Sequence, residues 1–150
     1  RPDLEEKKED RFRSRYLDAP NGALYPFGFG LTYTRFRVSP VQLDSSVLHP
    51  GETLKASVIL ENTGSRQGTE TLQLYIRDVS ASVVRPVKEL RDFRKVTLLP
   101  GESREVTFEI REEQLRFWRA DGTFGSEKGR FQVFIGQDSS VREFENFELL

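Results

Sequence analysis

The chain has 150 residues, 23 basic and 24 acidic side chains for a net charge of −1, and no cysteine. This balance of charge gives no support to nucleic-acid binding, and the lack of cysteine excludes disulfides and thiolate metal sites. No apolar run approaches the roughly 18 residues of a membrane span, so we expect no membrane partner. Because the sequence starts at Arg1 and contains no methionine, we expect a piece of a longer protein.

The first 18 residues are dense in charge, with six basic and six acidic side chains. We expect a solvated arm there rather than an ordered helix, because no capping residue supports the weak apolar stripe of Leu4, Phe12 and Tyr16. Residues 19–22, Ala-Pro-Asn-Gly, predict a turn after this arm.

Aromatic side chains crowd residues 23–36, where Pro26, Gly28 and Gly30 disfavour a helix. Such a cluster must leave water, so it either caps the core of its own domain or seals that domain against another body. We interpret it as the joint between a linker over residues 1–31 and a β domain over residues 32–150. The aromatic candidates for a domain interface are Tyr25, Phe27, Phe29 and Tyr33.

From Thr32 onward, apolar residues alternate with a period of two, which predicts strands. The expected strands cover residues 33–38, 41–43, 54–60, 72–76, 87–98, 106–110, 131–135 and 144–149. Pro40 indicates an edge strand or a switch between sheets, and a bulge near Arg91 and Asp92 would restore the phase of residues 87–98. Residues 78–88 form a longer connection.

Two turn signals and a hairpin signal separate these strands. Pro-Gly-Glu occurs at residues 50–52 and again at 100–102, which predicts two similar turns rather than a repeat protein. One helical turn is expected over residues 112–115, and Asp121-Gly122 is typical of a hairpin. About seven short strands without a long helix predict an all-β fold, an antiparallel β-sandwich.

The sequence holds no recognisable catalytic or metal-binding constellation. His49 is the only histidine and sits beside Pro50 in a predicted turn, so we expect a surface residue rather than a ligand or general base. Glu105 and Glu109 fall on an outward strand face. We therefore expect no catalytic residue, no cofactor and no metal in this chain.

Trp118 is the only tryptophan and follows Phe117. We expect it in the core of the sandwich, because a tryptophan in a β-sandwich is more often a core residue than an exposed one. The alternative is a platform on which a pyranose ring stacks, and Tyr75 is a second candidate for such a platform.

A series of short motifs resembles the C-terminal fibronectin type III-like domain of glycoside hydrolase family 3 β-glucosidases, above all those of the bacterial periplasmic type. The matching residues run in the family's order from about Arg15 to Leu150: 16–18, 21–22, 24–33, 61–64, 73–78, 85–90 with Phe93, 100–103, 117–118, 129–131 and 135–136. Each motif is weak alone, and the ordered combination is specific.

The resemblance implies an immunoglobulin/fibronectin type III-like sandwich. In that family the nucleophilic aspartate lies in a (β/α)₈ barrel and the acid/base glutamate usually in a following α/β sandwich, so neither carries over to this chain. The chain is implied to be a non-catalytic domain of a retaining β-glucosidase that hydrolyses terminal non-reducing β-D-glucosyl residues in the periplasm or outside the cell. It would dock on the upstream catalytic domains through residues 25–33 and the connection 78–88, which holds the further interface candidates Arg85 and Lys88. The alternative role is a carbohydrate-binding module.

Overall fold

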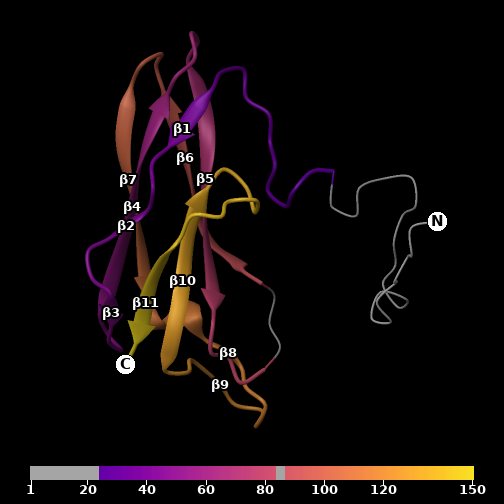
Figure 1. Ribbon diagram of the computed structural model, residues 1–150, viewed down its shortest axis with the longest axis vertical. Coiled ribbons are helices and arrows are strands. Elements are labelled where there is room, and N and C mark those ends of the chain that lie inside the picture. The colour runs from indigo at the N-terminus through magenta and orange to yellow at the C-terminus, as the bar shows by residue number, and fades with distance from the viewer. Residues whose placement is uncertain (1–23, 84–86) are drawn as a thin grey trace, which may run out of the picture.

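The computed structural model describes residues 24–83 and 87–150, and in this part the chain forms a sandwich of two β-sheets (Figure 1). The first sheet contains β1 (Phe36–Val38), β2 (Gln42–Leu43), β4 (Thr53–Asn62) and β7 (Ser103–Arg111). The second runs in the order β3 (Val47–Leu48), β11 (Glu145–Leu149), β10 (Gly129–Gly136), β5 (Gly68–Asp78) and β6 (Glu89–Leu98). The predicted all-β sandwich is confirmed. The arm and turn predicted over residues 1–22, and Arg85, lie outside the described residues.

The first three strands are one interrupted edge strand that changes sheets. β1 and β2 both pair antiparallel with β4, whereas β3 pairs parallel with β11. The strand is broken at Ser39 and Pro40, and the chain crosses to the second sheet between Leu43 and Val47. Pro40 therefore marks an edge strand as predicted, and the change of sheet follows a few residues later. With these pieces taken as one strand, the described sandwich has the seven strands expected.

The core lies between the two sheets and follows the predicted alternation. β4 and β7 pair along their whole facing length, with Leu54 opposite Ile110 and Val58 opposite Val106. The second sheet contributes inward side chains from β5, β10 and β11, and the rings of Phe131 and Phe147 stack at 5.4 Å between centroids. The buried inward rows comprise Leu54, Ala56, Val58, Leu60, Leu72, Leu74, Ile76, Val106, Phe108, Ile110, Phe131, Val133, Ile135, Phe147 and Leu149.

The two Pro-Gly-Glu segments form the same turn at the start of β4 and of β7. The amide of Glu52 donates to the carbonyl of His49, and that of Glu102 to the carbonyl of Leu99, each at 3.0 Å. Both turns need a left-handed backbone angle at the glycine, with φ of +86° at Gly51 and +74° at Gly101. The repeated Pro-Gly-Glu motif therefore reflects two turns of the same type.

A β-bulge in β6 confirms the irregularity predicted near Arg91 and Asp92. Tyr75 of β5 pairs with Leu90, and Leu74 pairs with Asp92, so that Arg91 is the extra residue. The bulge restores the phase of the strand. As a result Leu90 and Phe93 lie on the same, outer face of the second sheet, opposite Tyr75 and Gln73 respectively.

The expectation that Trp118 lies in the core is wrong. The 3-10 turn η2 (Glu112–Leu115) and the hairpin strands β8 (Phe117–Trp118) and β9 (Phe124–Gly125) form where predicted. Because neighbouring strand residues point to opposite sides, Phe117 takes the inward position and Trp118 is left 69% exposed. Within residues 24–83 and 87–150, no helix has the length and apolar character needed to cross a bilayer.

Candidate domain interface

The strap, as we call residues 24–33, lies outside the two sheets, where Figure 1 shows it in indigo before β1. The predicted interface residues Tyr25, Phe27, Phe29 and Tyr33 have exposed fractions between 43% and 93%. Tyr25 and Phe29 pack on one another with ring centroids 5.0 Å apart. The strap thus presents aromatic rings to solvent rather than capping the core of the sandwich.

A tight turn fixes the strap against the outer face of the second sheet. The amide of Phe29 donates to the carbonyl of Pro26 (3.1 Å), and the amide of Ser139 donates to the carbonyl of Phe27 (2.8 Å). Gly28 adopts a φ of +79°, and a Cβ there would lie 2.1 Å from Oε1 of Gln73. Glycine suits this position because the left-handed backbone angle is strained for other residues, and a Cβ would also displace the amide group of Gln73.

Gln73 joins the strap to the sheet. Its Nε2 donates to the carbonyls of Gly28 and Gln137, each at 2.9 Å, and its Oε1 accepts the hydroxyl of Tyr75. Alternation along β5 places Gln73 and Tyr75 on the outward face, yet both are buried. Burial raises the pKa of Tyr75, and the nearby carboxylate of Asp138 raises it further. Tyr75 is therefore no platform for a sugar, because its ring is covered.

Lys88 is half-buried beside the same network. Its ammonium donates to the carbonyl of Val141 and lies 4.6 Å from the centroid of the Phe134 ring and 5.6 Å from that of Tyr75. Burial lowers the pKa of Lys88, the charge of Asp138 opposes that shift, and Arg142 adds to it. Lys88 thus ties the loop after β10 to the sheet, and its contact with another domain stays a prediction.

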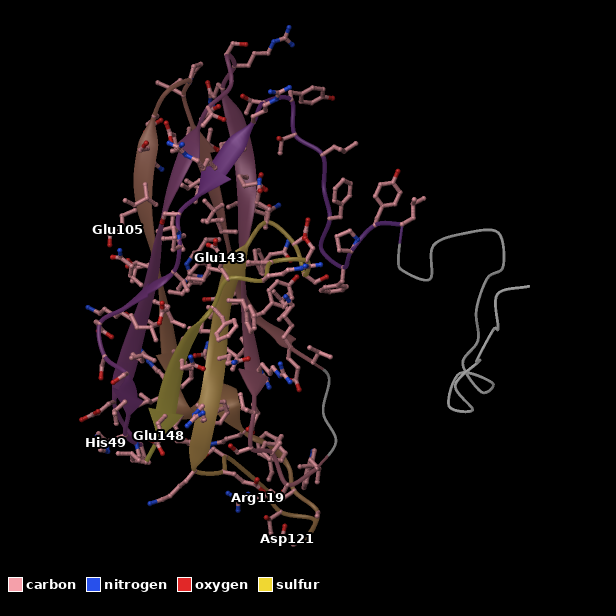
Figure 2. The ribbon with its side chains drawn as sticks, in the orientation of Figure 1. His49, Glu105, Arg119, Asp121, Glu143 and Glu148 are labelled. Carbon is pink, nitrogen blue, oxygen red and sulfur yellow. The ribbon has the colours of Figure 1, made fainter. Side chains whose placement is uncertain are left out.

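The β8–β9 hairpin carries a separate pair of exposed rings. Trp118 and Phe124 pack with centroids 5.4 Å apart and ring planes inclined by 55°. Oδ1 of Asp121 accepts from the amide (2.9 Å) and the hydroxyl (2.6 Å) of Thr123, which fixes the hairpin turn. Figure 2 shows Asp121 at the tip of this hairpin, at the end of the sandwich away from the strap.

The hairpin is joined to the sandwich through Glu112. Its carboxylate accepts from Nε and Nη2 of Arg116 (3.0 and 2.6 Å, both to Oε2) and from the hydroxyl of Ser126. These hydrogen bonds lower the pKa of Glu112. A second tie is the hydrogen bond from the amide of Ser82 to Glu127 (3.1 Å), which joins the connection after β5 to the segment after β9.

The candidate titratable residues do not converge. His49 is exposed in its turn and Glu105 points outward from β7. Figure 2 shows these two residues and Asp121 at well-separated places. Among the described residues, no three or more His, Cys, Asp or Glu side chains are grouped to hold a metal ion.

Sequence reasoning found the aromatic strap but missed the residue that holds it. The period-two pattern of residues 72–76 predicts an outward, exposed Gln73. Its contact with the strap depends on the strap and the loop after β10 meeting over β5. The signal in the sequence was a glutamine beside an apolar row, which is common on exposed strands and therefore uninformative.

Residues 70–139 match the family model described as a fibronectin type III-like domain. Over 144 residues, 96% of this chain, the sequence is 47% identical to the "Periplasmic beta-glucosidase" of Salmonella typhimurium, and the match covers 19% of that protein. It is 43% identical over 129 residues to "Beta-glucosidase BoGH3A" of Bacteroides ovatus, covering 85% of this chain and 17% of the relative. The chain thus spans about a fifth of the length of the curated relatives it matches.

Solved structures agree with this match. The β-glucosidase from Listeria innocua in complex with glucose superposes with a TM-score of 0.82 at 39% identity, covering 95% of this chain and 20% of that one. For the β-D-glucoside glucohydrolase from Trichoderma reesei the TM-score is 0.73 at 29% identity, covering 84% of this chain and 20% of that one. With its interrupted edge strand and seven-strand sandwich, the chain belongs to the fibronectin type III-like domains of glycoside hydrolase family 3 β-glucosidases.

Proposed function

We propose that this chain is a non-catalytic, structural domain of a larger β-glucosidase and that it docks on and stabilises the catalytic part that precedes it. The observation that carries the proposal is the strap, whose aromatic rings are exposed although its backbone is fixed by Gly28 and Gln73. Burying one such ring contributes about 1.5–3 kcal/mol, so a few rings are enough to hold two domains together.

The comparisons support the proposal that the chain is one part of a longer enzyme. The relatives are about five times as long as the matched region, and several are named β-glucosidases. Another relative, 39% identical, is named a putative β-xylosidase, so similar domains occur in enzymes that are named for different substrates. We propose residues 1–31 as the linker and 32–150 as the domain, and a retaining enzyme acting on terminal β-D-glucosyl residues.

We propose a periplasmic or secreted location, supported by the relative that is named periplasmic. The location is tested by fractionating the source cells and probing with an antibody against this domain. Recovery in the cytoplasmic fraction alone would contradict it.

Reconstitution tests the docking role directly. The 150-residue chain is added to the same enzyme truncated before the domain, and association and the melting temperature of the truncated enzyme are measured. We expect a complex and a raised melting temperature, because the strap aromatics become buried. Absence of both would contradict docking, and hydrolysis of a chromogenic β-glucoside by the chain alone would contradict a non-catalytic role.

Carbohydrate binding is a second candidate function, favoured by the exposure of Trp118 next to Phe124. Aromatic faces suit the apolar face of a pyranose ring. Trp118 is the only tryptophan of the 150 residues, so its fluorescence reports on this pair alone. A change on titration with gluco-oligosaccharides, lost in Phe124→Ala, would support the second function, and an unchanged spectrum would remove it.

A further inference from the structure

Two apolar side chains on β6 are exposed outside the strap. Leu90 is 40% and Phe93 54% exposed. Both face outward because the bulge at Arg91 shifts the phase of the strand between them. Without the extra residue, strict alternation would place Leu90 and Phe93, three residues apart, on opposite faces of the sheet. The bulge therefore aims a pair of large apolar residues at one side of an edge strand.

This pair lies beside the strap. Phe93 pairs with Gln73, whose amide holds the carbonyl of Gly28, and Leu90 pairs with Tyr75 on the same β5 strand. Directly opposite residues on one face have Cβ atoms about 4.5–5.5 Å apart. The β6 pair and the Gly28 turn of the strap therefore lie over neighbouring positions of β5, on the outer face of the second sheet.

The charges of β6 indicate what kind of surface would fit there. Arg91 is paired with Glu89 at 2.5 Å and Arg94 with Asp92 at 2.9 Å, so the strand neutralises much of its own charge. A partner that covers Leu90 and Phe93 thus needs an apolar surface rather than a strongly acidic one. The outer face of the first sheet differs, because its rows carry Lys55, Glu105 and Glu109 with Ile59 as a lone large apolar residue.

The path of the strap and the length of the relatives indicate the occupant. Figure 1 shows the strap on the side of the sandwich where β5 lies, and the carbonyl of Gly28 in the strap accepts from Gln73 of β5, so the strap leads the polypeptide to this surface. In the relatives, the matched part is the C-terminal fifth of the protein. A tethered partner has an effective concentration in the millimolar range, so a modest apolar surface is enough to keep it docked.

We infer that Leu90 and Phe93, together with the strap, form one docking surface for the upstream part of the same polypeptide. The inference rests on the proposed function and adds to it a second contact row that the bulge in β6 creates. The upstream surface that meets this row is apolar, and it covers the outer side of β6 as well as the strap.

Cysteine labelling tests this inference, because the chain has no cysteine of its own. Single variants Leu90→Cys, Phe93→Cys and Tyr33→Cys are compared with the matched control Ile59→Cys, since Ile59 is 52% exposed on the other sheet. Reaction with a maleimide is timed in the 150-residue chain, checked for folding by circular dichroism, and in the whole enzyme after subtracting its unsubstituted background.

We expect labelling at residues 90 and 93 to slow at least tenfold in the whole enzyme, with residue 59 unchanged. Unchanged rates at 90 and 93, or equal slowing at 59, would overturn the inference. Tyr33→Cys separates this from the proposed function. If labelling slows at residue 33 but not at residue 93, docking by the strap stands and the contribution of Leu90 and Phe93 is rejected. If labelling stays fast at both residues in the whole enzyme, docking itself is rejected.

Discussion

Over residues 72–76 both faces of β5 are buried, but by different parts of the chain. The inner row, Leu72, Leu74 and Ile76, packs between the sheets. The outer residues Gln73 and Tyr75 are covered by the strap, the loop after β10 and Lys88. Apolar packing accounts for the first face and hydrogen bonding for much of the second. The comparison shows that one strand belongs both to a self-contained core and to a surface that segments outside the sandwich complete.

The inner face should be the more costly to disturb. Leu74→Ala removes a fully buried side chain and should lower the free energy of unfolding by about 2–5 kcal/mol. Urea unfolding followed by circular dichroism measures this loss. A change below that of Gln73→Leu would reverse the ranking of the two faces.

The outer face should lose less, and locally. Gln73→Leu leaves the carbonyls of Gly28 and Gln137 and the hydroxyl of Tyr75 without this partner, at a cost of about 1–3 kcal/mol. The strap should also become accessible to protease. Gln132→Leu is the control, because Gln132 lies on the same sheet face and its amide donates an exposed, long hydrogen bond of 3.4 Å to Oδ1 of Asn146. If the two variants lose the same unfolding free energy and the strap is equally accessible to protease in both, Gln73 does not hold the strap to the sheet.

Gly28→Ala tests the contact between Gly28 and Gln73 from the side of the strap. The positive φ and the contact with Gln73 should make alanine unfavourable by about 1 kcal/mol or more. Detachment of the strap from the sheet would relieve this strain. Gly30→Ala is the matched control, since a Cβ there meets nothing within 4 Å. Limited proteolysis of both variants distinguishes them, and similar cleavage rates would contradict the account.

Acid should weaken the tie between the hairpin and the sandwich. The hydrogen bonds from Arg116 and Ser126 lower the pKa of Glu112 below its ordinary value of 4.5. The contribution of Glu112 to the free energy of unfolding is therefore complete above pH 4.5, and it is lost as the pH falls through the lowered pKa of Glu112 in the folded state. Glu112→Gln should show less loss of stability than the unsubstituted chain between pH 7 and pH 3. A pH dependence identical in both would remove Glu112 as its cause.

The smallest effect is expected at the exposed ring of the hairpin. Trp118→Ala should change the free energy of unfolding by less than about 0.5 kcal/mol, as exposed substitutions usually do. Phe117→Ala, one residue earlier and buried, should cost about 3–5 kcal/mol. Thermal unfolding of the two variants measures the difference. A large loss of unfolding free energy for Trp118→Ala would show that Trp118 has a structural role.

The sequence predicted those elements whose burial follows from their own periodicity. The alternation of β4 and β7 and the out-of-phase residues near Arg91 were read correctly, because each depends on the strand alone. Gln73 and Tyr75 were placed outward because the segments that cover them are distant in sequence, 45 residues in the case of Gly28. Trp118 was misplaced because residue type favours the core, whereas the two-residue strand leaves only Phe117 an inward position.

Hydrogen exchange of the strap tests the central claim most directly. Backbone amides of residues 24–33 are followed by mass spectrometry in the 150-residue chain and in the whole enzyme. If the strap is a docking surface, its amides should exchange markedly more slowly in the whole enzyme, while those of the β8–β9 hairpin tip should not change. Identical exchange of residues 24–33 in both would contradict the account.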